Sequence, residues 1–187
     1  MEENCTPLQA AATFAACEAL WANPQARQTI DMLFDEAYQT FRPKVVVLDD
    51  DPTGVQTVHD VPVVTNWELP TLLAEFQRPE PMFFVLTNSR SFSAEKTKQV
   101  HQEIARNVVA ASRQTGREYL LVCRGDSTLR GHMPVEEQAM AETLASLEEP
   151  CFDGEILCPF FREGGRYTYQ GVHYVQEGDH LTPAAQT

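Results

Sequence analysis

The sequence predicts an α/β fold: a three-layer domain in which a mainly parallel sheet is flanked by helices. Two observations support this prediction. Short apolar segments rich in Val, Leu and Phe each run directly into a polar loop, as buried strands of a parallel sheet do. Stretches with helical spacing lie between them, which gives the β-α alternation of such sheets. The three clearest strands are Lys44–Leu48, Met82–Leu86 and Tyr119–Cys123.

The other elements of this domain follow from the same patterns. A fourth strand, Glu155–Cys158, ends at Pro159, and residues 164–187 are expected to form a short hairpin around Gly171 followed by coil. Apolar residues at helical spacing predict the intervening helices. These helices are Pro70–Gln77, Ala94–Arg113 and Val135–Leu147.

The N-terminal region has a different character. Leu8–Ala22 and Gln25–Phe41 carry apolar residues at roughly helical spacing, and Pro24 stands where a second helix could begin. They predict a helical hairpin. The chain is therefore divided into a helical extension, residues 1–43, and an α/β domain, residues 44–187.

Composition excludes several classes of partner. The chain has 187 residues, of which 43% are apolar and 22% charged, a composition typical of a globular domain. A formal net charge of −13 disfavours nucleic acid and anionic membrane surfaces, because long-range repulsion opposes each encounter. No run approaches the ~20 apolar residues of a membrane span, and the five cysteines include no C-x-x-C pair. We expect a cytoplasmic protein with reduced thiols that binds neither nucleic acid nor membrane.

The loop after the first strand is strongly acidic. Asp49, Asp50 and Asp51 place adjacent carboxylates at a strand end, where they can accept hydrogen bonds from sugar hydroxyls or hold a cation. Thr53 and Gly54 suit a tight turn in which backbone N–H groups face a ligand. The alternative is a solvated acidic turn that caps the next segment.

Two further polar loops follow the next strands. Thr87–Arg90 combines small hydrogen-bonding side chains with one guanidinium, and a serine after it can cap the next helix. Arg124–His132 packs two arginines, an aspartate and two hydroxyls into nine residues, which could fix the carboxylate and hydroxyls of a polyol acid. A salt-bridged loop between sheet and helix is the alternative. Because ligands collect at the carboxyl ends of parallel strands, the three loops are expected to line one cleft.

These motifs resemble the four-carbon acid sugar kinases, over about Lys44 to the end of the chain. The family's Asp-Asp-x-Thr-Gly motif is matched by Asp50, Asp51, Thr53 and Gly54, and its Asp-Ser-Thr-Leu-Arg-Gly stretch is matched by residues 126–131. Further matches are Thr87, Ser89, Arg90, Pro159, Phe161, Gly165 and Arg166, followed by Gly171–Tyr174.

The resemblance implies a two-domain enzyme whose N-terminal domain binds a short sugar acid and whose C-terminal domain carries most of the ATP site. We therefore expect residues 44–187 to be a sugar-acid-binding domain, with ATP and Mg²⁺ held mainly by a C-terminal nucleotide-binding domain that is absent from this chain. That domain would be its partner. Alone, the chain is expected to be inactive in ATP-dependent phosphorylation of a sugar-acid hydroxyl.

Residue roles follow from the matched positions. Asp126, favoured over Asp51, would activate the attacking hydroxyl, and no metal ligand is assigned. Arg90, Arg124 and Arg130 would bind substrate carboxylate or the transferring phosphate; many family members have lysine in place of Arg124, so here only an electrostatic role remains. The other expected substrate-binding residues are Asp50, Thr53, Gly54, Ser89, Ser127, Thr128, Gly131 and Arg166.

Two alternatives stay open. Asp49, Asp51 and Thr53 satisfy the Asp-x-Asp-x-Thr pattern of haloacid-dehalogenase-like phosphatases, in which Asp49 would be the nucleophile and Asp51 the acid/base. That scheme also needs a downstream acidic pair, and no second carboxylate follows closely after Asp126. The other alternative is a sugar-acid-binding module without catalytic activity.

Overall fold

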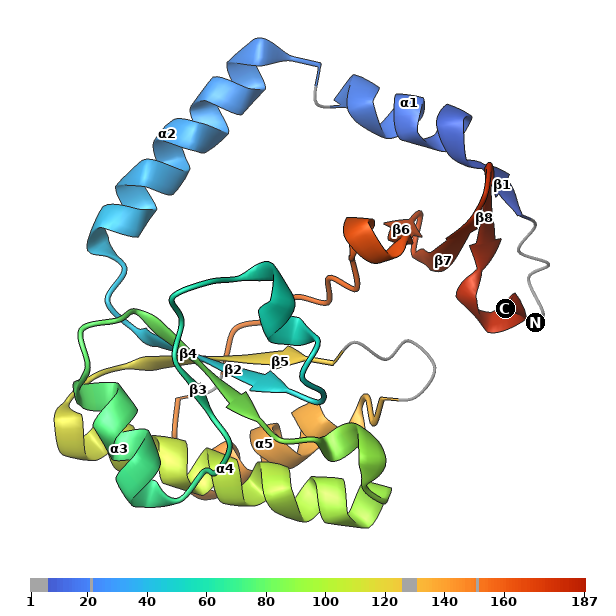
Figure 1. Cartoon of the computed structure of the whole chain (residues 1–187). Helices are drawn as coiled ribbons and strands as arrows, with labels where there is room; N and C mark the ends of the chain where they lie inside the picture. The colour runs from blue at the N-terminus through green and yellow to red at the C-terminus, as the bar shows by residue number, and fades with distance from the viewer. Residues whose placement is uncertain (1–6, 21, 126–130, 151) are drawn as a thin grey trace. The chain divides into compact units, whose positions relative to one another are not determined.

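The computed structural model describes residues 7–20, 22–125, 131–150 and 152–187 (Figure 1). They form two compact units. One unit is Arg42–Asp153, and the other combines Met1–Phe41 with Gly154–Thr187.

The Arg42–Asp153 unit is built on a parallel sheet. Its strand order is β3-β4-β2-β5, and every neighbouring pair is parallel. The three strands predicted from apolar runs are present, each within one residue of the expected end. The strands are β2 (Lys44–Asp49), β3 (Val63–Val64), β4 (Met82–Leu86) and β5 (Tyr119–Arg124).

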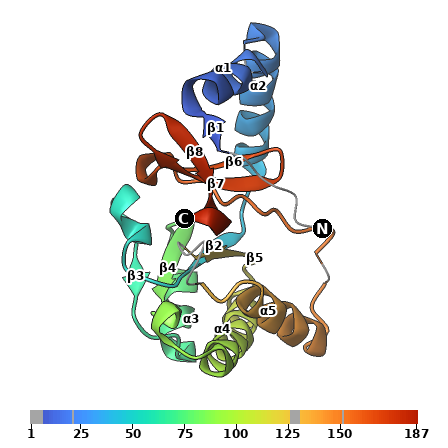
Figure 2. The same cartoon turned by 90° about the vertical axis from the view of Figure 1, so that its right-hand side faces the viewer.

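Three helices pack on one face of this sheet (Figures 1 and 2). They enclose a core in which alternate strand residues such as Val46 and Phe83 meet Ile104 from the longest helix. Ser93 caps that helix by accepting a hydrogen bond from Lys96 N at 3.2 Å. The predicted α/β fold with a parallel sheet and flanking helices is therefore confirmed, but the described residues of this unit form two layers where three were predicted, because all three helices lie on one face. The helices are α3 (Leu69–Gln77), α4 (Ala94–Thr115) and α5 (Val135–Ser146).

One predicted strand is wrong. Glu155–Cys158 has no regular structure, and Ile156 is 93% exposed. Apolar composition gives a segment the propensity for a strand, but a strand also needs a partner to complete its backbone hydrogen bonds. The fourth strand is instead β3, whose two residues directly follow Pro62 and are too few to give a periodic signal.

The other unit contains an antiparallel sheet with strand order β1-β8-β7-β6. The hairpin around Gly171 is confirmed: Gln170 and Gly171 both have positive φ, as a two-residue hairpin turn requires. The expected coil after it is wrong, because β8 and β1 extend the sheet. The strands are β1 (Leu8–Gln9), β6 (Arg166–Tyr169), β7 (Val172–Glu177) and β8 (His180–Pro183).

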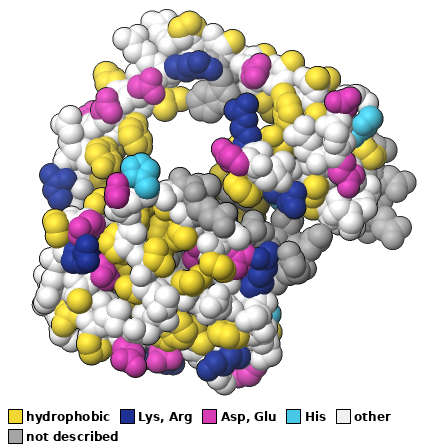
Figure 3. Space-filling view, viewed as in Figure 1, with side chains coloured by type: hydrophobic (Ala, Val, Ile, Leu, Met, Phe, Trp, Pro, Cys, Tyr) yellow, Lys and Arg dark blue, Asp and Glu magenta, His cyan; other side chains and the backbone are white. Residues whose placement is uncertain are grey.

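Two helices occupy the N-terminal region, as expected. They are α1 (Ala10–Leu20) and α2 (Pro24–Thr40), and Asn23 caps α2 through its side chain, which accepts from Gln25 N at 3.0 Å. Helix α2 buries none of its residues, and its apolar side chains reach the surface (Figure 3), so the close packing expected of a helical hairpin is not present. Within the described ranges, no helix has both the length and the apolarity of a membrane span.

A buried lysine marks the start of β2. Lys44 is fully buried, and its Nζ donates to the carbonyl oxygens of Glu80 and, at 3.2 Å, of Arg78. Burial, together with the nearby Arg117 guanidinium, lowers the pKa of Lys44 to about 8. The folded state therefore releases this proton at lower pH than the unfolded chain does.

Lys44 makes the stability of the protein depend on pH. Since the unfolded chain binds more protons than the folded one above the lowered pKa, the free energy of unfolding should rise with pH from about 7 to 9.5. One pKa unit corresponds to roughly 1.4 kcal/mol. Across this pH range, the free energy of unfolding should therefore rise by about 2 kcal/mol more in wild type than in Lys44→Met. Urea unfolding at each pH measures the gain. The exposed Lys96→Met variant should keep the wild-type slope; a parallel slope in Lys44→Met would contradict the assignment.

Candidate functional site

The ends of three parallel strands lie level with one another. Asp49, the last residue of β2, pairs with Leu86 at the end of β4 and with Arg124 at the end of β5. The loops that follow these strands therefore begin at the same edge of the sheet (Figure 1).

Three adjacent carboxyl groups are buried at this edge. Asp49, Asp50 and Asp51 are only 0%, 3% and 6% exposed. One carboxylate oxygen from each lies within 4.8 Å of those of the other two. Removing like charges from water is costly unless opposite charges or hydrogen-bond donors compensate them.

Two arginines provide opposite charge. Arg124 Nη1 lies 3.3 Å from Asp49 Oδ1 and 3.9 Å from Asp51 Oδ1, and Arg90 Nη1 donates to Asp51 Oδ2. The side chains of Arg90 and Arg124 are 23% and 25% exposed, whereas those of Asp51 and Asp49 are 8% and 0% exposed.

The turn after β2 is shaped around these carboxyl groups. Asp51 Oδ1 accepts hydrogen bonds from the backbone N–H of Thr53, at 2.7 Å, and from its hydroxyl. Gly54 begins a short 3₁₀ helix, η1 (Gly54–Thr57), and a Cβ at this position would lie 2.1 Å from Asp49 Oδ2. Only glycine leaves room for the buried carboxyl group here.

Side-chain hydrogen bonds to the protein interior fix the loop after β4. Asn88 has a left-handed backbone, with φ of 55°, and Ser89 begins the 3₁₀ helix η2 (Ser89–Ser91). Ser89 is fully buried, and its hydroxyl donates to Glu136 Oε1 at 2.9 Å. The Thr87 hydroxyl donates to the carbonyl oxygen of Asp49 at 2.9 Å, which ties this loop to the end of β2.

The structure brings together most of the described residues expected to form the site. Asp50, Asp51, Gly54, Arg90 and Arg124 gather at the carboxyl edge, with the exposed Thr53 on the turn and the buried Ser89 behind the loop. Sequence reasoning missed Glu136, a buried acidic residue whose only sequence signal is its place in the first turn of α5.

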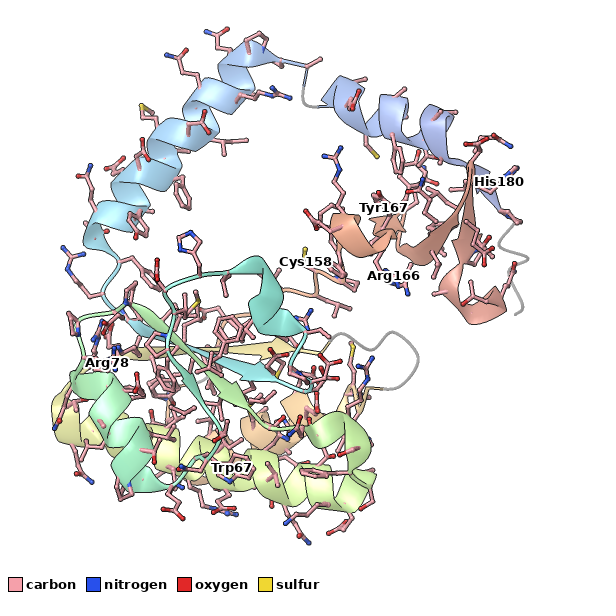
Figure 4. All side chains as sticks on the ribbon, viewed as in Figure 1. Trp67, Arg78, Cys158, Arg166, Tyr167 and His180 are labelled. Carbon is pink, nitrogen blue, oxygen red and sulfur yellow. The ribbon has the colours of Figure 1, made fainter. Side chains whose placement is uncertain are left out.

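The remaining expected site residues lie in the other unit, outside the described ranges or at their border. Arg166 belongs to the other compact unit, where its Nη1 donates to the carbonyl oxygen of Gly164 at 2.9 Å (Figure 4). Gly131 directly follows residues that the structure leaves undescribed. The predicted residues outside the described ranges are Asp126, Ser127, Thr128 and Arg130.

The packing of Gly54 against the Asp49 carboxyl group can be tested by adding a methyl group. Gly54→Ala should lower the free energy of unfolding by about 1–3 kcal/mol, the usual cost of overpacking, because the new methyl group would displace the Asp49 carboxyl group. Gly154→Ala is the matched control, since a Cβ there meets no atom within 4 Å. Urea unfolding measures both; equal stabilities of the two variants would contradict the packing described.

Comparisons with known proteins agree with this architecture. Among solved structures, the chain is similar to a domain of unknown function from Bordetella bronchiseptica, crystallised with bound citrate as a domain-swapped dimer. The TM-score is 0.57 and the identity 25%, over 79% of this chain and 36% of that one. The present chain thus spans little more than a third of that protein's length. Among curated proteins, none matches it.

A family model supports the family resemblance seen in the sequence. The model described as the sugar-binding N-terminal domain matches residues 45–187, which include both the acidic cluster and the antiparallel hairpin. This chain therefore belongs to the sugar-binding N-terminal domain family.

Proposed function

We propose that this chain binds the substrate for an ATP-dependent kinase that phosphorylates a hydroxyl of a short, four-carbon sugar acid. The observation that carries the proposal is the cluster at the carboxyl edge of the sheet, where Arg90 and Arg124 face buried aspartates. Guanidinium groups bind carboxylates in a planar, charge-assisted geometry, and carboxylates accept hydrogen bonds from hydroxyls. A sugar acid carries both complementary groups.

Arg124 is the best-placed anchor for the substrate carboxylate. Its side chain is one-quarter exposed, and its two ion pairs with described residues are both made through Nη1. A guanidinium has five N–H groups, so these contacts leave further donor capacity at this residue. The citrate bound to the similar Bordetella bronchiseptica protein supports this ligand class, since citrate is also a hydroxy acid.

The contacts of Asp51 favour Asp126 as the residue that activates the attacking hydroxyl. Both carboxylate oxygens of Asp51 are already engaged, because Oδ1 accepts hydrogen bonds from the N–H and hydroxyl of Thr53 and Oδ2 accepts one from Arg90. We therefore assign Asp51 to holding Arg90. Asp126 would accept the proton, as the family motif implies.

ATP and Mg²⁺ belong mainly to a C-terminal domain in this proposal. Phosphoryl transfer depends on positioning and on neutralising charge, and ATP with its magnesium supplies the phosphoryl group. The three aspartates offer the oxygen ligands that magnesium prefers, but Arg90 and Arg124 already face two of them. As they stand, these residues do not fit a metal ion.

The buried position of Asp49 argues against the phosphatase alternative. A nucleophilic aspartate must reach the phosphorus atom of its substrate, yet Asp49 is fully buried, faces Arg124 and lies against Gly54. A binding module without catalytic activity differs from the proposal only in the role of the complete protein.

Binding of sugar acids tests the proposal directly. Titration calorimetry should detect binding of threonate or erythronate to the 187-residue chain, whereas threitol, which lacks the carboxylate, should not bind. Arg124→Gln should weaken affinity by about 2 kcal/mol, or roughly 30-fold, because a charge-assisted contact is lost.

The matched control for Arg124→Gln is Arg113→Gln. Arg113 also pairs with a carboxylate, Glu149, but its side chain is 58% exposed and lies at the end of α4. This variant should bind as wild type does. Undiminished binding by Arg124→Gln, with wild-type binding present, would contradict the role given to Arg124.

The division of labour between domains gives a separate prediction. The 187-residue chain should not transfer phosphate from ATP to a sugar acid, because the nucleotide site is assigned to a separate domain. A coupled assay for ADP release, with threonate, erythronate and Mg²⁺ present, measures this. Sustained turnover that depends on the sugar acid would place the nucleotide site within this chain and overturn the division.

A further inference from the structure

Glu136 reaches the candidate site from the helical layer. It lies in the first turn of α5 and is only 5% exposed. Its Oε1 accepts the hydrogen bond from the Ser89 hydroxyl at 2.9 Å. Its Oε2 lies beneath the end of β5, since a Cβ built on Gly125 would be 3.9 Å from this atom and also 3.9 Å from Asp50 Oδ2. One carboxyl group thus lies beside the start of the loops that follow β2, β4 and β5.

The contact with Ser89 bears on the position of Arg90. Ser89 directly precedes Arg90, and the carbonyl oxygen of Ser89 accepts a hydrogen bond from the Thr97 hydroxyl at 3.4 Å. The backbone N–H of Arg90 donates to the carbonyl oxygen of Asp50 at 3.4 Å. The backbone that carries the Arg90 guanidinium is therefore fixed by Glu136 and α4 on one side and by the end of β2 on the other.

His101 supports Glu136 from α4. Its Nδ1 lies 2.9 Å from the carbonyl oxygen of Thr97, which can only accept, so Nδ1 carries a proton. Its Nε2 then faces Glu136 Oε1 at 3.7 Å, and the two side chains are 2% and 6% exposed. The imidazole thus lies next to the Glu136 carboxyl group on its α4 side, and both groups are buried.

We propose that Glu136, supported by His101, is the positioning residue of the substrate site. Through its hydrogen bond with the Ser89 hydroxyl, it fixes the loop after β4, so that Arg90 faces the carboxyl cluster. Glu136 itself does not touch the ligand. The inference rests on the proposed function, because the positioned group, Arg90, is one of those assigned to the sugar acid.

Two substitutions at this position separate hydrogen bonding from charge. Glu136→Gln and Glu136→Met both remove the charge and preserve the length of the side chain, but only Gln retains an oxygen that accepts from Ser89. Affinity for threonate and erythronate should fall at least tenfold in Glu136→Met and less than threefold in Glu136→Gln. Glu75→Met is the matched control: Glu75 is also buried, but lies in α3 and pairs with Arg78, so affinity should stay at the wild-type value.

A second measurement does not need a ligand. Amide hydrogen exchange over residues 87–92 should be faster in Glu136→Met than in wild type or Glu136→Gln, because the Ser89 hydroxyl loses its acceptor. If Glu136→Met does not fold, Ser89→Ala removes the same hydrogen bond with a smaller change and should give the same two results.

The outcomes distinguish this inference from the proposed function. Equal weakening by Gln and Met, or wild-type affinity in Glu136→Met, would overturn positioning by the acceptor oxygen. If wild type binds neither sugar acid, the proposed function fails and exchange alone decides the role of Glu136. Faster exchange confined to Glu136→Met would then support positioning, and equal exchange in all variants would overturn it.

Discussion

The burial of three adjacent carboxyl groups is the constraint on which the candidate site depends. Asp49, Asp50 and Asp51 enter the interior because β2 lies at the centre of the sheet and runs directly into them. Their burial requires compensation, and the neighbouring strands bring it: β5 ends in Arg124, and the loop after β4 carries Arg90. The buried carboxyl groups also explain the glycine at position 54, since the Asp49 carboxyl group occupies the space that a side chain would need.

The two ends of β2 handle buried charge in different ways. At its start, Lys44 is fully buried and donates to backbone carbonyl oxygens, which belong to the main chain and not to a movable side chain. At its end, the carboxyl groups are met by arginine side chains that are about one-quarter exposed. Backbone partners make the first end a structural anchor, whereas flexible side chains at the second end can exchange one anionic partner for another. This difference favours the carboxyl end as the site for a ligand.

The sequence was sufficient to predict features that depend on neighbours along the chain. The apolar runs of β2, β4 and β5 and the polar residues after them gave both the sheet and the edge where Arg90 and Arg124 lie. Features that depend on distant contacts were not predictable. Glu155–Cys158 has the composition of a strand but pairs with none, and β3 is too short for a pattern. Glu136 could not be found because its partner, Ser89, lies 47 positions away.

Ion pairs within the site have a consequence for selectivity under the proposed function. A ligand carboxylate that binds the remaining N–H groups of Arg124 shares this guanidinium with Asp49 and Asp51, which lowers the gain from its own ion pair. A neutral polyol has no carboxylate to bind Arg124, and an acid without hydroxyls has no donor to offer the acidic cluster. A ligand that presents a carboxylate and hydroxyls together satisfies both sets of groups. The arrangement therefore favours hydroxy acids over either simple sugars or simple carboxylates, provided the loop after β4 stays in place, which is the role assigned to Glu136.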